Sequence, residues 1–146
     1  MDLTDHILPA PLLLDFPAED EKSAVMTIAD LLLPNHFVAD HSRLAAAIWE
    51  RQCLQAPLLG DGIALPHART SAVTDLVFAL GRCRSPVPFQ PDGRNVRLIF
   101  LYATPPHLIA PSLAVIAALV ARLRDEETLR VLLSSPDEAS FKAPLI

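Results

Sequence analysis

The chain has little of what marks disulfide-bonded or nucleic-acid-binding proteins. Its 146 residues include two cysteines, and 12 Lys and Arg stand against 17 Asp and Glu, a formal net charge of −5. Cys53 and Cys83 have no paired spacing, as expected of reduced thiols in a cytoplasmic protein. The acidic balance argues against a nucleic-acid-binding surface and favours partners with basic faces.

Long apolar runs are missing as well. Hydrophobic residues make up 51% of the chain, but no window approaches the ~18 uninterrupted apolar residues of a membrane span. The start, Met1 to His6, lacks the basic region of a secretory signal. We therefore expect a soluble cytoplasmic protein without membrane insertion. Its 146 residues fit one domain, residues 1–146, large enough for a substantial core.

Helical and extended segments alternate along the chain, without an internal repeat. Four segments show helical periodicity or helix start and stop signals: residues 20–33, a stretch from Asp40 or Ser42 to about Cys53, residues 111–124 and residues 125–133. The third is apolar nearly all round, which predicts that it is deeply packed. The first fifteen residues are rich in Leu and Pro and are expected to drape over the body ahead of the first helix.

Two continuous apolar runs, Leu76–Leu80 and Val96–Tyr102, are typical of central strands that are buried on both faces. Between them, four turn-forming residues predict a turn-rich connection: Pro86, Pro88, Pro91 and Gly93. Trp49 and Tyr102 are expected to be partly buried core aromatics. Strands interleaved with helices predict an α/β sandwich.

The most informative stretch is residues 60–69, Gly-Asp-Gly-Ile-Ala-Leu-Pro-His-Ala-Arg. Gly60 and Gly62 allow a tight turn and a close approach of the backbone to a ligand. The next three residues suit a short buried strand that Pro66 ends, which would hold His67 at the lip of that strand. A fixed histidine with Arg69 two residues on suits attack on an anionic phosphoryl group. The alternative is a loop histidine that only satisfies a backbone carbonyl.

This segment resembles the active-site signature of the enzyme IIA domains of the fructose–mannitol class in the bacterial sugar phosphotransferase system, a class that includes the stand-alone nitrogen-regulatory IIA proteins. The family pattern is roughly Arg-Glu, a short spacer, then Ser-Thr-Gly-Ile-Gly-x-Gly-Ile-Ala-Ile-Pro-His-Gly-Lys/Arg. Arg51 lies sixteen residues before His67, as the family arginine does, and the likeness covers nearly the whole chain. The other matching positions are Gly60, Gly62, Ile63, Ala64, Leu65, Pro66 and Arg69.

The resemblance implies a single-domain sandwich with a mixed β-sheet and helices on both faces. It also implies a phosphotransferase-type component, in which His67 accepts a phosphoryl group from a histidine-containing phosphocarrier protein. Arg51 and Arg69 would be the cations, and Gly60 and Gly62 would leave room for the phosphate. Because the group arrives already attached to a donor histidine, no metal or cofactor is expected. Apart from the resemblance, Arg51 also suits a surface role at a helix C-terminus, where a cation is favoured.

Three positions depart from the family pattern. Residues 56–59, Ala-Pro-Leu-Leu, replace Ser-Thr-Gly-Ile and remove two hydroxyls, and Ala68 replaces the glycine after the histidine. Family members also tend to carry a second histidine at the start of the late helix, and an ungapped count from Pro105 places Ser112 there. His107, five residues earlier, either reaches inward in its stead or is an exposed turn residue.

Three functions remain open at this point. The first is a phosphoryl carrier in a regulatory, nitrogen-type role that acts on a target protein. The second is a regulatory binding module with a degraded active site that no longer carries phosphate. The third is a IIA component that feeds a sugar-specific IIB on another chain. The replaced residues 56–59 and the missing second histidine are the features that bear on the choice between the first two.

Overall fold

The computed structural model describes residues 1–146 and contains one six-stranded mixed β-sheet. Its strands are β1 (Leu12–Phe16), β2 (Leu58–Leu59), β3 (Ile63–Ala64), β4 (His67–Arg69), β5 (Val77–Phe89) and β6 (Arg94–Thr104). They lie in the order β1-β5-β6-β3-β2, and β4 also pairs with β6. The β5–β6 and β2–β3 pairs are antiparallel, whereas β1, β3 and β4 run parallel to the long strands beside them.

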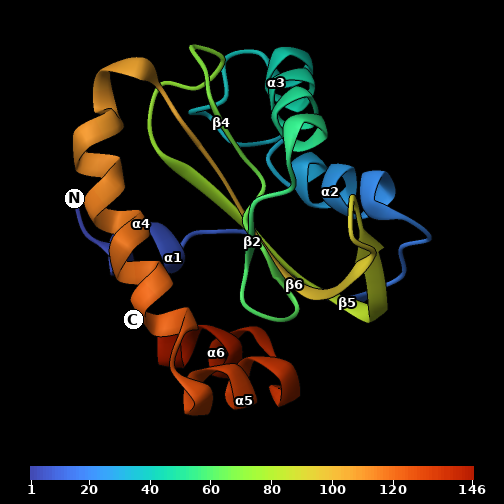
Figure 1. The fold of residues 1–146 in the computed structure, drawn as a ribbon. Coiled ribbons are helices and arrows are strands. Elements are labelled where there is room, and N and C mark those ends of the chain that lie inside the picture. The colour runs from blue at the N-terminus through green and yellow to red at the C-terminus, as the bar shows by residue number, and fades with distance from the viewer.

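Helices cover both faces of this sheet (Figure 1). They are α1 (Leu3–Ile7), α2 (Glu21–Asp30), α3 (His41–Leu54), α4 (Ile109–Leu123), α5 (Glu126–Ser134) and α6 (Glu138–Lys142). Five of the six begin after an aspartate whose carboxylate accepts a bond from the amide three residues on: Asp2, Asp20, Asp40, Asp125 and Asp137. These caps satisfy amides that the helix itself leaves unpaired. They set the helix starts, including the choice of Asp40 over Ser42.

The sheet separates two hydrophobic cores. Successive side chains of a strand point to opposite faces, so Ile99 and Leu101 of β6 join one core and Leu98 and Phe100 join the other. The first core is closed by α2 and α3, and the second by α1, α4, α5 and α6. The predicted burial of β6 on both faces and the predicted α/β sandwich are confirmed.

The N-terminal segment is regular, and the expectation that it drapes over the body is wrong. Residues 3–7 form α1, and β1 joins the sheet parallel to β5, with Leu12 opposite Leu80. Pro11 lies just before this edge strand and its carbonyl accepts from the Leu80 amide at 2.9 Å. A proline at the start of an edge strand costs no ladder bond, so the proline content did not exclude a strand here.

The β5–β6 connection is shorter than the sequence predicts. Pro86 and Pro88 lie inside β5, and the tight connection is left to residues 90–93. The pairing register between β5 and β6 shifts between Arg82 and Val87. Such an irregularity interrupts the ladder and accommodates a proline within a strand.

Helix α4 is buried on one side only, so the expected deep packing is wrong. Val115, Leu119 and Leu123 are buried against the sheet, whereas Leu113 is 61% exposed. Much of the outer face of α4 is alanine. Alanine counts as apolar in the sequence, but it is too small to require burial. Residues 106–123 form a helical stretch long and apolar enough to cross a membrane by length and composition, which the sequence analysis did not anticipate. In this fold one side of the stretch packs on the sheet, and 22% of it is buried.

Two buried cations tie the C-terminal helices to earlier parts of the chain. The Arg82 guanidinium of β5 donates to both carboxylate oxygens of Asp15 at 2.8 and 2.9 Å. It also donates to the Leu132 carbonyl at 2.9 Å and to the Ser135 hydroxyl at 3.3 Å. Lys142 is 4% exposed and donates to the carbonyls of residues 8 and 10 at 2.8 and 2.6 Å. Arg82 thus connects β5 to β1 and to the end of α5, and Lys142 connects α6 to the segment between α1 and β1.

The two thiols have different surroundings. Cys53 is exposed on α3, Cys83 is buried in β5, and neither forms a disulfide. Burial raises the pKa of the Cys83 thiol to about 11. A thiol in this environment stays protonated and unreactive at neutral pH.

Candidate active site

Pro66 divides one edge of the sheet into the short strands β3 and β4. Both strands pair with β6 in the same register, and His67 lies opposite Tyr102. Pro66 has no amide to give to the ladder, but its carbonyl accepts from the Tyr102 amide at 3.0 Å. His67 is therefore the first residue of β4, whereas the sequence predicts it at the end of the preceding short strand.

The His67 imidazole is held on two sides. Its Nδ1 lies 2.8 Å from the Leu65 carbonyl oxygen. Because a carbonyl only accepts, Nδ1 carries the proton and Nε2 keeps its lone pair. The ring also stacks on Tyr102, with ring centroids 4.8 Å apart and planes 3° from parallel. The tautomer and the plane of the ring are both fixed.

Burial lowers the pKa of His67, and the Arg51 charge adds a smaller lowering, while the bond to Leu65 acts in the opposite direction. Burial disfavours the charged imidazolium. The net shift is downward from the ordinary value of 6.5. The ring is therefore neutral, and Nε2 nucleophilic, at a lower pH than in an ordinary histidine.

The alternation of side chains along β4 and β6 gathers further polar groups on the same face. Arg69 lies two residues after His67, and Thr104 two residues after Tyr102, so all four belong to one side of the pair. From α4, Ser112 reaches this face, and its hydroxyl is 2.7 Å from that of Thr104. The two hydroxyls are buried and serve as partners to one another.

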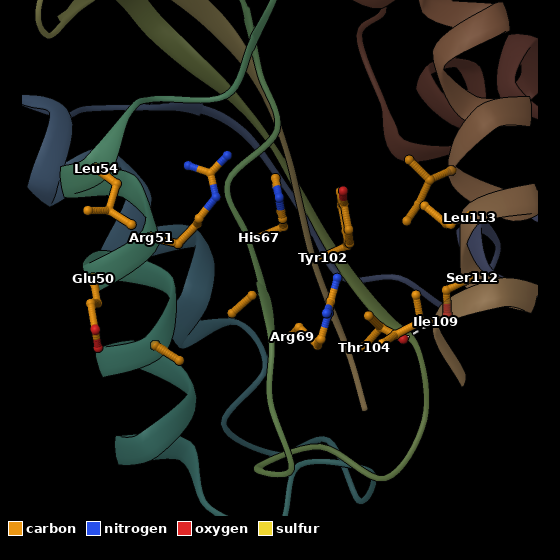
Figure 2. A pocket seen from close by; sticks show the side chains of 13 residues that line it. Glu50, Arg51, Leu54, His67, Arg69, Tyr102, Thr104, Ile109, Ser112 and Leu113 are labelled. Carbon is orange, nitrogen blue, oxygen red and sulfur yellow. Dashed lines mark hydrogen bonds between the residues drawn. The ribbon is translucent and has the colours of Figure 1, made fainter. Parts of the chain in front are cut away.

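Arg51 approaches from the last turn of α3, beside His67 (Figure 2). Its Nη1 donates to the Gln55 carbonyl at 2.7 Å, just past the helix end. This bond is the helix-terminus role that the sequence analysis left as an alternative. Its positive charge adds to the lowering of the His67 pKa that burial causes. Arg51 thus satisfies the end of α3 and directs its field at the histidine.

A cavity of about 530 Å³ opens over these groups between α3 and α4 (Figure 2). It is lined by Ala47, Glu50, Arg51, Leu54, His67, Ala68, Arg69, Tyr102, Thr104, Ile109, Ser112, Leu113 and Ile116. Leu54 and Leu113 are 79% and 61% exposed. The cavity combines a neutral imidazole and two guanidinium groups with an apolar surround. This set can hold a small anionic group on a nucleophilic nitrogen.

The structure separates the two candidates for the second histidine position. Ser112 lines the cavity, as the ungapped count from Pro105 places it. His107 lies in a short 3-10 turn, Pro106–Leu108, is exposed, and does not line the cavity. It matches the exposed turn residue that the sequence analysis left open.

The two glycines of the motif lie away from the cavity. Gly60 and Gly62 form the turn between β2 and β3 with φ of +55° and +90°, a region that side chains rarely adopt. The Gly62 carbonyl accepts from the Arg97 and Leu98 amides at 2.9 and 3.0 Å. Neither glycine lines the cavity. In this structure they fix where β3 begins, and hence where His67 lies.

The family model "Phosphoenolpyruvate-dependent sugar phosphotransferase system, EIIA 2" matches residues 12–145. The chain belongs to the EIIA 2 family. The predicted family is confirmed.

Relatives of this EIIA 2 domain include sugar-specific and regulatory proteins. It is 29% identical over 146 residues to the fructose-specific EIIA component of Haloferax volcanii. That alignment covers 97% of this chain and 95% of the relative. It is 25% identical over 147 residues to a nitrogen regulatory protein of Bradyrhizobium diazoefficiens, 99% of this chain and 95% of the relative. The chain spans only 22% of the fructose-specific EIIABC component of Bacillus subtilis, to which it is 24% identical over 139 residues, 94% of this chain.

Solved structures agree with the fold of this EIIA 2 domain. The nitrogen regulatory protein IIA-Ntr of Neisseria meningitidis superposes with a TM-score of 0.84 at 26% identity, over 92% of each chain. The IIA mannitol domain of Escherichia coli gives a TM-score of 0.78 at 21% identity, over 92% of this chain and 95% of that one, and shows the fold alone.

Sequence reasoning missed two residues of the EIIA 2 cavity, Tyr102 and Thr104. Tyr102 ends an apolar run and is the partly buried aromatic that the sequence predicts, but its ring also forms one side of the histidine site. The only signal was the position of both residues at the carboxyl end of a long strand. Their neighbour across the sheet is β4, whose three residues carry no periodicity that could be recognised in advance.

Proposed function

We propose that Nε2 of His67 accepts a phosphoryl group from a histidine-containing phosphocarrier protein in the cytoplasm, and that the phosphorylated state serves a regulatory, nitrogen-type role. The observation that carries the proposal is the pinned imidazole. Nδ1 keeps its proton and donates a hydrogen bond to the Leu65 carbonyl, so the Nε2 lone pair is available in a cavity that also contains Arg51. A fixed neutral imidazole beside a guanidinium is suited to attack on phosphorus.

The transfer needs few chemical parts. The Nε2 lone pair forms the new N–P bond while the N–P bond on the donor histidine breaks and returns its electron pair to the donor nitrogen. The Nδ1 proton stays on Nδ1 throughout, hydrogen-bonded to the Leu65 carbonyl oxygen. Arg51 and Arg69 balance charge on the phosphoryl oxygens from the cavity wall. Positioning and charge stabilisation carry most of the catalysis in phosphoryl transfer.

The regulatory role is supported by the likeness to nitrogen regulatory proteins. The IIA-Ntr structure has a TM-score of 0.84 at 26% identity, and the Bradyrhizobium protein matches over nearly its whole length. Delivery to a separate IIB is the second candidate, supported by 29% identity to a fructose-specific EIIA component. A complex of IIA mannitol with phosphorylated IIB from Escherichia coli contains the same fold, with a TM-score of 0.77.

Labelling by a phosphorylated histidine phosphocarrier tests the acceptor. The purified protein should take up acid-labile, base-stable phosphate, and His67→Ala should take up none. His107→Ala and His36→Ala are matched controls on exposed histidines and should label like the wild type. Equal labelling of His67→Ala would overturn the assignment. A wild-type protein that takes up no phosphate would support the degraded binding module.

A second incubation separates regulation from sugar delivery. Purified phosphoprotein is mixed with an isolated fructose-type IIB domain, and the location of the phosphate is followed over time. A regulatory protein should keep its phosphate on His67. Rapid transfer to the IIB domain would favour the sugar-delivery candidate over the regulatory one.

A further inference from the structure

We infer that Tyr102 is a further catalytic residue of this site, whose hydroxyl donates a hydrogen bond to the phosphoryl group carried on His67. The inference rests on the proposed function and names a group that the family resemblance did not supply. In the family pattern a second histidine stands near the phosphorylated one. This chain has Ser112 at that position, and the structure offers Tyr102, whose ring stacks on that of His67.

The first argument is placement. His67 and Tyr102 are direct neighbours across two parallel strands, and their rings are stacked with centroids 4.8 Å apart. A phenol is longer than an imidazole, so the tyrosine hydroxyl projects past the outer edge of the histidine ring. In Figure 2 the side chains of Arg51, His67 and Tyr102 stand in a row and point to the same side. A group bonded to Nε2 therefore lies between the guanidinium and the phenol.

The second argument is availability. The Tyr102 hydroxyl makes no hydrogen bond within the chain, although its ring is half-buried. Burial raises the pKa of Tyr102 above its usual value of 10, against a smaller lowering by Arg51. The hydroxyl is therefore protonated at neutral pH and able to donate. A phosphoryl oxygen is an acceptor for which such a donor is well suited.

The third argument is the state of the alternative donor. The Ser112 hydroxyl is bonded to that of Thr104 at 2.7 Å, and Ser112 is only 1% exposed. To reach a phosphoryl group it would have to leave a partner in a buried place. Breaking the pair loses a hydrogen bond between two buried groups. Tyr102 gives up nothing when it turns its hydrogen to the phosphate.

The Tyr102 hydrogen bond does not change which bonds form and break in the transfer. The N–P bond forms at Nε2 and breaks on the donor, and Tyr102 forms no covalent bond and loses no proton. Its hydrogen bond stabilises the added negative charge beside His67, both during transfer and in the phosphoprotein. The His67 ring therefore has a cation, Arg51, on one side and a neutral donor, Tyr102, on the other.

Two substitutions separate the hydroxyl from the ring. Tyr102→Phe keeps the stack and removes only the hydroxyl, whereas Tyr102→Leu removes both. The fraction phosphorylated is measured at equilibrium with the phosphorylated phosphocarrier, together with the hydrolysis rate of the isolated phosphoprotein. Tyr102→Phe should shift that equilibrium toward the donor by about tenfold or more, the usual size for a hydrogen bond to a charged group. It should also shorten the lifetime of the phosphohistidine.

The controls make each outcome decisive. Ser85→Ala removes an exposed hydroxyl from β5 and should behave as the wild type. Wild-type labelling that is lost in His67→Ala establishes the proposed function independently of Tyr102. With that in place, equal equilibria and lifetimes for Tyr102→Phe and the wild type would overturn the inference. A loss confined to Tyr102→Leu would also overturn it, because the ring alone would then account for the effect. A wild-type protein without label would overturn both proposals.

Discussion

At the scale of single residues, the candidate site depends on what its neighbours do to one imidazole. Leu65 fixes the tautomer, Tyr102 fixes the plane, and burial with Arg51 lowers the pKa. Leu65 is two residues from His67 in the chain, Tyr102 lies opposite it across one pair of strands, and Arg51 comes from the last turn of α3. The reactivity of the histidine can therefore be tested one side chain at a time.

Replacing Arg51 with glutamine should raise the pKa of His67, because the Arg51 charge contributes to the lowering. The pKa should still lie below 6.5, since burial is the larger cause. An NMR pH titration of the His67 ring measures both values. Arg122→Gln, on the exposed side of α4, is the control and should leave the titration unchanged. An unshifted titration in Arg51→Gln would show that the charge does not reach the ring.

Arg51→Lys tests geometry while the charge is kept. An ammonium cannot reproduce the planar fork of a guanidinium, so phosphoryl transfer should slow by about tenfold or more. A time course of phosphoryl transfer from the phosphorylated phosphocarrier, quenched at intervals, measures the transfer rate. If Arg51 only served the helix end, the rate would stay the same and stability would change by at most about 1 kcal/mol.

The lowered pKa of His67 also predicts a pH dependence of stability. Below about 6.5 the unfolded chain binds a proton at this position more readily than the folded one. The contribution of His67 is therefore complete above pH 6.5 and declines as the pH falls through the lowered native value. Urea unfolding at pH 7.5 and 5.5 should show a smaller drop in His67→Gln than in the wild type. Equal drops in the two proteins would contradict the shift.

At the scale of elements, local signals were enough for most helices. The aspartate caps and the periodic apolar residues predicted α2, α3 and α5 to within a few residues. The strands β1 and β4 were not predicted, because each is short and exists through pairing with a partner far along the chain. The same reason explains the site: His67 and Arg51 follow from a motif, but Tyr102 enters only through the pairing of β4 with β6.

Gly81 shows how closely α2 packs on β5. A Cβ at this position would lie 2.3 Å from Ile28 Cδ1 and 2.9 Å from Phe16 Cε1. Gly81→Ala should therefore lower the free energy of unfolding by about 1–3 kcal/mol, as overpacking does. Urea denaturation measures the loss. Ile28→Val removes the clashing Cδ1, so Gly81→Ala should cost less stability in an Ile28→Val background than in the wild type. An equal cost in both backgrounds would show that the strain does not come from Ile28.

At the scale of the whole molecule, Arg82 joins elements that are distant in the sequence. It lies on β5 and donates to Asp15 at the sheet edge and to Leu132 and Ser135 of the C-terminal region. The guanidinium is buried, while the Asp15 carboxylate is about half exposed. Most of its structural importance therefore lies in the buried acceptors that it satisfies.

Arg82→Met should lower the free energy of unfolding by about 2–4 kcal/mol, because it leaves buried acceptors without a donor. Arg84→Met, an exposed neighbour on the same strand, is the matched control and should change stability by less than about 0.5 kcal/mol. Urea unfolding at neutral pH measures both. Equal small effects would mean that water replaces the guanidinium without loss.

Because one cysteine is exposed and the other buried, the protein can be labelled at a single site. A maleimide dye at neutral pH should couple once per molecule, to Cys53, because the buried Cys83 thiol has a pKa of about 11. Cys53 follows Arg51 by two residues in the last turn of α3. The native sequence thus carries an attachment point for a fluorophore or spin label near the cavity. The approach of a donor or target protein could be timed there without engineering a new thiol.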